Sequence, residues 1–324
     1  MTRALVTGAA GFIGSHLVRE LLQRDYDVLA VDNLSTGARS NLPPDGTPNF
    51  RFVQGDIRDA DGCRTWCREI DVVFHEAAKV SVPESIETPD ETFAVNAGGT
   101  FHLLEAARLQ GVRRFVYASS CAVYGDDPVL PKSEHMALSP RSPYAASKAA
   151  SEQFALSYHG AWGIETIGLR YFNVFGPGQD PNGAYAAVVA AFVNRCLQGK
   201  GCTIYGTGEQ TRDFVFVKDV VRANILAGEA PAAAAGQVYN IGSGSRTSVR
   251  GLYDAIAQAA GVHRVPRLAP PRSGDVMHSL ANIGQAYSNL GYLPQTSFQE
   301  GIDATVAWYR ASAAADVPAV RVAK

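Results

Sequence analysis

The chain has 324 residues, 46% of them apolar, and a formal net charge of −2 at pH 7. It is long enough to bury a large core, and we expect two lobes. The balanced charge gives no basic surface for nucleic acid, so no nucleic-acid partner is expected. The longest apolar stretch, Ala184–Val193, is much shorter than the roughly 18 residues of a membrane span, so no membrane partner is expected either.

The start of the chain and its cysteines predict the compartment. A strand is predicted from the first residues onward, which leaves no room for a signal peptide. The five cysteines are odd in number and lack framework spacing, as is typical of reduced thiols. The seven histidines are scattered and predict no metal site. We therefore expect a cytoplasmic protein without a metal.

Short β-branched runs alternate with helical patterns over the first half of the chain. This alternation predicts an α/β fold, a doubly wound Rossmann sheet that is parallel and covered by helices on both faces. The expected strands are Ala4–Thr7, Asp27–Val31, Phe50–Gln54, Val72–His75, Phe115–Ala118 and Thr166–Leu169. The expected helices are Ile13–Gln23, Glu91–Gln110 and Tyr144–His159.

After Arg170 the pattern changes, with clustered glycine and proline and longer loops. We predict a first domain of residues 1–172, to which segments near 215–241 return with a last strand at Val238–Ile241. A smaller α/β substrate-binding lobe is expected over residues 173–310, and a frayed tail over 311–324. Further helices are expected over Ala184–Leu197, Lys218–Leu226 and Val249–Ala259.

Three glycines follow the first predicted strand, in Gly8-Ala-Ala-Gly11-Phe12-Ile13-Gly14. The spacing alone is a weak signal, but its place between a strand and a helix strengthens it. Glycines at this point permit a tight turn and let a pyrophosphate approach the N-terminus of the helix. The segment Gly8–Gly14, with Phe12 and Ile13, is therefore the predicted dinucleotide loop.

Other strand ends complete the predicted cofactor site. Asp32 ends the second strand, where a carboxylate accepts from a ribose 2′-hydroxyl and repels a 2′-phosphate, so NAD is predicted rather than NADP. Asp56, followed by Ile57 after the third strand, either contacts the adenine or caps a helix. After the fourth strand, the small residues Ala77 and Ala78 let the cofactor lie close.

Tyr144 and Lys148 stand four residues apart in Tyr-Ala-Ala-Ser-Lys. An ordinary phenol has a pKa of about 10, and an ammonium one helical turn away is expected to lower it. The pair then suits removal of a proton from a substrate hydroxyl while a hydride leaves the same carbon. Ser120, at the end of the fifth strand, is expected to share that proton. Taken alone, each feature is more often an exposed helix face or a turn residue.

Four motifs together resemble those of the extended short-chain dehydrogenase/reductase family, and within it the nucleotide-sugar 4-epimerases, over nearly the whole chain. They are the glycine pattern, Ser-Ser-x-x-Val-Tyr-Gly from Ser119, Tyr-x-x-x-Lys from Tyr144 and Arg-Tyr-Phe-Asn from Arg170. The segment Asp32-Asn33-Leu-Ser-Thr-Gly resembles the family's cofactor loop, which implies that Asn33 contacts the cofactor.

The resemblance implies a UDP-sugar substrate. By it, Asn173 contacts the diphosphate or the sugar, Arg212 and Arg272 pair with the phosphates, and Asp275 holds a uridine ribose hydroxyl. Two guanidinium groups suit the forked oxygens of a diphosphate. For either arginine, the alternative is a surface ion pair.

The implied activity is NAD-dependent 4-epimerisation, an isomerase reaction. Tyr144 takes the proton of the C4 hydroxyl as the C4 hydride passes to NAD⁺, the 4-ketose turns, and the hydride returns to its other face. NAD is regenerated in each turnover and is expected to stay bound. Relatives that dehydrate or decarboxylate carry an acidic residue where this chain has Cys121, Ala122 and Val123, so neither activity is expected.

The expected substrates depend on few residues. Ser279 stands where enzymes restricted to UDP-glucose place a tyrosine, and a small side chain leaves room for a 2-acetamido group. The segment 179–187 resembles the branch that handles N-acetylated UDP-hexosamines. We predict interconversion of UDP-GlcNAc and UDP-GalNAc, together with UDP-Glc and UDP-Gal. Ser81 either contacts the sugar or caps a loop.

Two other functions are open. A UDP-glucuronate 4-epimerase needs a further cation for the sugar carboxylate, for which Arg195 and Lys200 are candidates. An NAD-sensing regulatory protein without turnover usually loses one of Tyr144 and Lys148, and both are present. A homodimer is predicted because the apolar helix faces over Phe93–Leu109 and Ala145–Leu156 resemble the family's dimer interface, the alternative being packing on the sheet.

Overall fold

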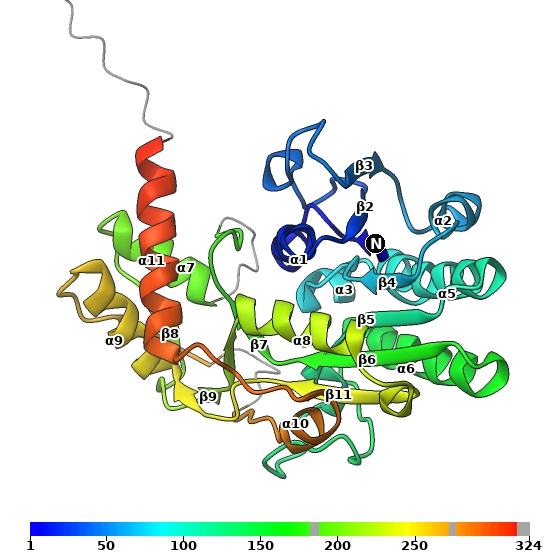
Figure 1. Ribbon diagram of the computed structural model, residues 1–324. Coiled ribbons are helices and arrows are strands. Elements are labelled where there is room, and N and C mark those ends of the chain that lie inside the picture. Colours follow the sequence, from blue (N-terminus) through cyan, green and yellow to red (C-terminus); the bar gives the residue numbers. More distant parts are fainter. Residues whose placement is uncertain (182–187, 272–276, 316–324) are drawn as a thin grey trace, which may run out of the picture.

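The computed structural model describes residues 1–181, 188–271 and 277–315. In this part of the chain, the main sheet has seven strands, and every neighbouring pair is parallel. In spatial order the strands are β11 (Gln237–Ile241), β6 (Glu165–Tyr171), β5 (Arg114–Ser120), β4 (Val72–His75), β1 (Arg3–Thr7), β2 (Asp27–Asp32) and β3 (Phe50–Gln54). Each predicted strand is confirmed, with ends extended by up to two residues (Figure 1).

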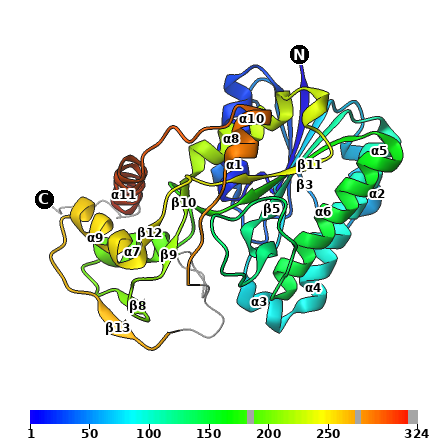
Figure 2. The same cartoon turned by 90° about the horizontal axis from the view of Figure 1, so that it is seen from below.

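Helices cover both faces of this sheet, which explains why its inner strands are buried almost throughout. Figure 2 shows α1 (Phe12–Gln23) and α8 (Val217–Glu229) on one face and α2 (Ala60–Trp66), α5 (Gly99–Gln110) and α6 (Pro143–Trp162) on the other. Strand order reverses between β1 and β4, so a crevice for ligands is expected at the carboxyl ends of these strands. The predicted doubly wound Rossmann fold is confirmed.

The remaining elements of the first half are short. They are the helical turns η1 (Arg39–Asn41) and η3 (Cys121–Tyr124) and the helices α3 (Val82–Glu87) and α4 (Pro89–Phe93). The helix expected over Glu91–Gln110 is confirmed as one unbroken helical run through α4 and α5, with a wide π turn, η2 (Ala94–Gly98), inside it. Within this turn, the Asn96 side chain accepts from the main-chain N of Lys79 at 2.8 Å and donates to the carbonyl oxygen of Lys79 at 2.9 Å.

A smaller lobe lies beside the main sheet (Figure 2). Its helices α7 (Val188–Leu197), α9 (Val249–Ala260) and α11 (Phe298–Ala315) pack around an apolar core that includes Phe175, Phe214 and Phe216. Three two-stranded pairs accompany them: β7 (Asn173–Phe175) with β10 (Phe214–Phe216), β8 (Thr203–Tyr205) with β13 (Arg267–Ala269), and β9 (Thr211–Arg212) with β12 (Thr247–Ser248). Helix α10 (Gly284–Leu290) packs against β11, and η4 (Ala232–Ala234) precedes that strand.

The carboxyl end differs from the expectation. Helix α11 continues to Ala315, so the predicted fraying from Ala311 is wrong for residues 311–315, and residues 316–324 lie outside the described part. The helix is held on the lobe by Ile302, Val306 and Tyr309, which recur at helical spacing and are buried. The start predicted for the helix at Ala184 also lies outside the described residues.

One buried carboxylate, Asp213, joins segments that are far apart in the sequence. It accepts hydrogen bonds from the main-chain N of Ser243 (2.6 Å), Gly244 (3.1 Å) and Ala281 (3.1 Å), and from the Ser243 hydroxyl (2.7 Å). Its side chain has no exposed surface. Asp213 therefore ties the chain before β10 to the segment after β11 and to the segment before α10.

A second buried carboxylate, Glu152, joins α6 to β5 and β6. It accepts from the Nε and Nη2 atoms of Arg170 at 2.9 and 2.7 Å and from the Ser119 hydroxyl at 2.5 Å. The Arg170 guanidinium also donates to the hydroxyl of Tyr124 at 2.8 Å. Both charges are satisfied, so losing one partner leaves the other charge buried and unpaired.

We predict that Arg170→Met lowers the free energy of unfolding by about 3–5 kcal/mol, because Glu152 then stays buried without its partner. Arg141→Met, which breaks the exposed pair with Asp126, is the control, with an expected loss below about 1 kcal/mol. Urea unfolding followed by circular dichroism measures both. Equal losses in the two variants would contradict the assignment.

Candidate active site

The predicted dinucleotide loop forms a turn that leaves no room for a side chain at Gly8 or Gly14. Gly8 has a φ of +65°, and a Cβ added there would lie 2.6 Å from the main-chain N of Ala77. A Cβ on Gly14 would lie 2.1 Å from the carbonyl oxygen of Gly8. Gly11 precedes α1 and offers no side-chain cap to the free N–H groups of the helix. This bare helix N-terminus fits a pyrophosphate.

Asp32 lies buried beside this turn, at the end of β2. Its Oδ2 accepts from the main-chain N of Ala10 at 2.9 Å, and its Oδ1 accepts from Leu34 N at 2.7 Å. The carboxylate is thereby fixed in orientation and keeps acceptor capacity for a ribose hydroxyl. Phe12 and Ile13, in the first turn of α1, are half-buried and pack against the core of the smaller lobe.

Asn33 and Asp56 come together across the ends of β2 and β3. The amide of Asn33 donates to Oδ2 of Asp56 at 3.0 Å, and the Arg58 guanidinium forms an ion pair with the same carboxylate. Hydrogen bonds from Arg58 hold the pKa of Asp56 well below its usual range. The helix-cap alternative is wrong, because Asp59 caps α2. Contact of Asp56 with an adenine stays a prediction.

The other predicted cofactor residues surround the same strand ends. Ile57 is buried and packs against Gly99, where an added Cβ would lie 2.4 Å from its Cδ1 atom. Ala77 and Ala78 follow β4 and are half-buried. The close approach of Gly8 to Ala77 places these small residues next to the glycine turn.

Tyr144 and Lys148 are buried on the first turns of α6. The Lys148 ammonium donates to the carbonyl oxygen of Ala118, on β5, at 2.9 Å. Tyr144 is hydrogen-bonded to Ser120, at the end of the same strand. The hydroxyl of Ser120 also accepts from Ala122 N at 3.2 Å, so this serine is both a turn residue and a partner of Tyr144.

The pKa of Tyr144 shifts against the expectation. Burial raises it to about 12, and the hydrogen bond with Ser120 opposes this rise without cancelling it. The expected lowering of the Tyr144 pKa is therefore wrong for the protein alone, because desolvation of the phenolate outweighs the hydrogen bond with Ser120. Burial also lowers the pKa of Lys148 to about 8, opposed by the charges of Glu76 and Glu152.

The predicted substrate residues are only partly described. The Asn173 amide donates to the carbonyl oxygen of Asp213 at 3.2 Å and to the hydroxyl of Ser279 at 3.4 Å, so these two predicted residues meet. The Arg212 guanidinium donates to the carbonyl oxygens of Thr211 and Met277, at 2.9 and 3.3 Å. Arg272 and Asp275 lie outside the described residues.

Ser81 has a capping role, as one of its two predicted roles requires, but it caps a helix rather than a loop. It precedes α3 and accepts from the main-chain N of Glu84 at 3.2 Å. Contact with a sugar stays a prediction.

Sequence reasoning missed two acidic residues near the site. Glu152 follows Lys148 by four residues, as Lys148 follows Tyr144, so the helical spacing alone places all three on one face of α6. Glu76 follows β4 and accepts from the Tyr171 hydroxyl at 2.8 Å. Nothing in the sequence pairs Glu76 with Tyr171, because they come from strands that are not neighbours in the sheet.

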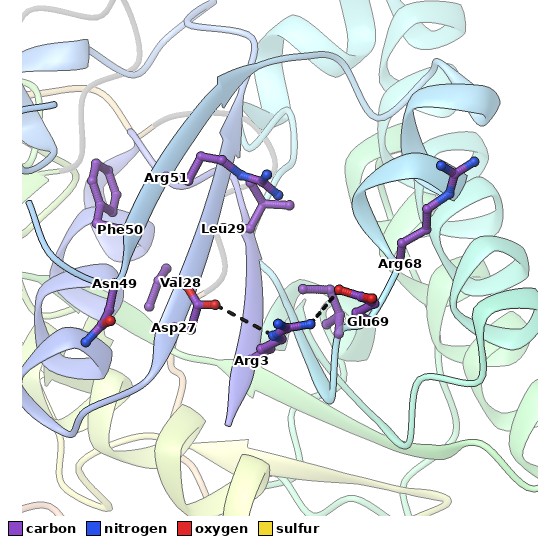
Figure 3. A pocket seen from close by; sticks show the side chains of 10 residues that line it. Arg3, Asp27, Val28, Leu29, Asn49, Phe50, Arg51, Arg68 and Glu69 are labelled. Atoms are coloured by element: carbon purple, nitrogen blue, oxygen red, sulfur yellow. Dashed lines mark hydrogen bonds and ion pairs between the residues drawn. The ribbon is translucent and has the colours of Figure 1, made fainter. Parts of the chain in front are cut away.

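A groove of about 460 Å³ lies elsewhere, at the opposite ends of β1, β2 and β3. Figure 3 shows Arg3 between Asp27 and Glu69, and Arg51 and Arg68 also line the groove. The glycine turn and Tyr144 are at the carboxyl ends of the strands, so this groove is separate from the candidate site. Among the residues that the structure describes, no cluster of side chains fits a metal ion, and no helix is long and apolar enough to cross a membrane.

Comparison with known proteins agrees with this geometry. The model of the NAD dependent epimerase/dehydratase family matches residues 4–242. A UDP-glucose 4-epimerase of Mycolicibacterium smegmatis is 44% identical over 311 residues, which cover 95% of this chain and 98% of the relative. The chain belongs to the NAD dependent epimerase/dehydratase family. Its cofactor is therefore NAD, and the resemblance to nucleotide-sugar 4-epimerases is confirmed.

Solved structures are similar over the same length. UDP-glucose 4-epimerase from Thermotoga maritima, with UDP-glucose, is 38% identical with a TM-score of 0.91, covering 96% of this chain and 100% of the other. UDP-N-acetylglucosamine 4-epimerase from Methanobrevibacter ruminantium, in complex with UDP-N-acetylmuramic acid, is 36% identical with a TM-score of 0.92, covering 96% and 99%. Both lobes of this chain therefore have counterparts in enzymes of this family.

We predict that Gly14→Ala weakens NAD binding at least about tenfold, or about 1.4 kcal/mol, because the added Cβ meets the Gly8 carbonyl and opens the turn. Gly160→Ala is the control, since its Cβ would meet nothing within 4 Å; in a helix it is expected to be neutral or stabilising by up to about 1 kcal/mol. Isothermal titration with NAD measures both. Unchanged affinity in Gly14→Ala would show that the turn does not hold the cofactor.

Proposed function

We propose that the protein catalyses NAD-dependent 4-epimerisation of UDP-hexoses. The observation that carries this proposal is the meeting of Tyr144, Ser120 and Lys148 at the carboxyl end of β5. They lie at the same edge of the sheet as the glycine turn that precedes α1. The similarity to two kinds of UDP-sugar 4-epimerase supports the same reaction.

The proposed chemistry divides between cofactor and protein. Bound NAD supplies a hydride acceptor that also returns the hydride, so the net reaction is isomerisation. Tyr144 takes the proton from the C4 hydroxyl and later gives it back, and Ser120 holds the same oxygen. Because burial raises the pKa of Tyr144 to about 12, the phenolate needs positive charge nearby. Lys148, anchored to Ala118, supplies one such charge.

The segment after β5 argues against dehydration, which the family description also includes. It holds Cys121, Ala122 and Val123, none of them acidic. Burial raises the pKa of Cys121 to about 12, so at neutral pH its thiol remains protonated and is a poor base. An elimination that needs an extra carboxylate has no such group there.

The proposed substrates include N-acetylated UDP-hexoses. Ser279 is small and buried, and its hydroxyl meets the amide of Asn173. A 2-acetamido group fits beside a serine, whereas a tyrosine ring would fill that space. We assign both the UDP-GlcNAc/UDP-GalNAc pair and the UDP-Glc/UDP-Gal pair. Arg212 and Arg272 are proposed to bind the phosphates and Asp275 a ribose hydroxyl.

We further propose that residues 1–172, with the returning segments near 215–241, bind NAD and that 173–310 bind the UDP-sugar. We propose a homodimer that acts in the cytoplasm. Support for the dimer comes from α5 and α6, where Phe101 and Phe154 are each 39% exposed with ring centroids 5.7 Å apart. Contiguous exposed apolar patches mark interaction sites, and this aromatic pair lies on the two helices predicted to form the interface.

No described contact favours a UDP-glucuronate 4-epimerase. Its candidate cations, Arg195 and Lys200, are both exposed, and the Nε atom of Arg195 donates to the carbonyl oxygen of Gly201 at 2.7 Å. A regulatory protein without turnover is also disfavoured, because Tyr144 and Lys148 are intact and positioned on α6. Thermal stabilisation by NAD without conversion of any UDP-sugar would favour it instead.

We predict that Tyr144→Phe lowers kcat for UDP-glucose conversion by about 10²–10⁴, because the base is removed, while bound NAD is retained. Tyr287→Phe is the control: this tyrosine is on α10 and 55% exposed, and the rate should not change. A coupled assay for UDP-galactose measures conversion. Full activity in Tyr144→Phe would refute the assigned base.

We predict that Ser279→Tyr lowers conversion of UDP-GlcNAc at least about tenfold and leaves conversion of UDP-glucose intact, because the ring occupies the acetamido space. Ser279→Ala, which keeps that space open, should convert both sugars. Product analysis for each nucleotide sugar, without added reductant, measures the ratio. If the unaltered protein turns over UDP-glucose but not UDP-GlcNAc, the small-residue argument fails.

A further inference from the structure

Glu76 is an acidic residue that the proposed reaction does not use. It follows β4 directly, its main-chain N donates to Thr7 O at 3.1 Å, and its side chain is half-buried. The carboxylate accepts from the Tyr171 hydroxyl at 2.8 Å, and the Asn224 amide donates to that hydroxyl at 2.7 Å. Tyr171 and Asn224 are both buried. A chain of two hydrogen bonds, from α8 through β6, therefore fixes this carboxylate.

The same carboxylate lies close to the catalytic lysine. The register of β4 and β5 pairs His75 with Tyr117, so Glu76 comes level with Ala118, one residue further along. The Lys148 ammonium binds the carbonyl oxygen of Ala118. We propose that Glu76 is a positioning residue for catalysis, whose carboxylate keeps Lys148 in its ammonium form and is itself held by Tyr171 and Asn224.

The charges around the lysine support this role. Burial lowers the pKa of Lys148 to about 8, and Glu76 opposes that fall more strongly than Glu152. Burial raises the pKa of Glu76 to about 7, while the hydrogen bond from Tyr171 and the charge of Lys148 lower it. His75 also faces Lys148, but burial lowers its pKa to about 3, so it is neutral.

The sign of the effect follows from these directions. Lys148 is fully protonated well below pH 8, and it loses its proton as the pH rises through its pKa of about 8. Glu76 is charged above about pH 7, where the lysine needs support. Removing the carboxylate therefore lowers the pH at which Lys148 loses its proton. At acidic pH, Lys148 stays protonated with or without it.

This inference rests on the proposed function, and Glu76→Gln tests it. We predict that kcat of the NAD-loaded enzyme is unchanged at pH 6 and at least about fivefold lower at pH 8. Tyr171→Phe, which removes a donor that lowers the pKa of Glu76, should shift the alkaline limb in the same direction but less. Glu20→Gln, in the exposed pair with Arg24, is the control and should match the unaltered enzyme.

A purely structural role for Glu76 predicts a different result. The rate would then fall by the same factor at every pH, which would overturn the inference. A second readout is the pH titration of the Lys148 Cε resonance in ¹³C-lysine-labelled protein, expected to move to lower pH in Glu76→Gln. If no UDP-sugar is converted, the proposed function fails while this titration still tests the coupling, and equal lysine titrations in both proteins would refute it.

Discussion

The geometry of the catalytic edge depends on the buried ion pair between Glu152 and Arg170. The carboxylate also accepts from Ser119, so one group links α6, β5 and β6. Two catalytic residues adjoin members of this network, and the third is bonded to one of them: Ser120 follows Ser119 in the chain, Lys148 precedes Glu152 by one helical turn, and Tyr144 is hydrogen-bonded to Ser120. Burying both charges costs desolvation free energy. The ion pair and its hydrogen bonds offset that cost only when every partner is present.

Burial then sets the protonation states around this edge. It raises the pKa of Tyr144 to about 12 and of Glu76 to about 7, and it lowers the pKa of Lys148 to about 8 and of His75 to about 3. All four shifts favour the neutral form. In such an environment a single added charge, from a cofactor or a neighbouring carboxylate, has a large effect on its neighbours.

The sequence predicted what depends on local pattern. The β-branched runs located every strand of the main sheet, and fixed spacing located the glycine turn and the Tyr144–Lys148 pair. It did not predict what depends on distant contacts. The hydrogen bonds between the Asn96 amide and the main chain of Lys79 join segments that no local pattern links, and the direction of the pKa shift at Tyr144 arises from burial by the folded chain. Glu76 and Tyr171 meet only because the sheet brings two separated strands to one edge.

The hydrogen bonds of Asp213 have a consequence for how the chain evolves and can be engineered. The chain leaves the main sheet after β6 and returns to it at β11. The Asp213 carboxylate binds the segments that pass between the lobes, at Ser243, Gly244 and Ala281. The two lobes are therefore connected at several points of the chain and do not follow one another as two separate segments. A gene fragment that encodes either lobe alone would lack part of this hydrogen-bond network. Exchange of substrate lobes between relatives therefore requires several discontinuous segments to be transferred together.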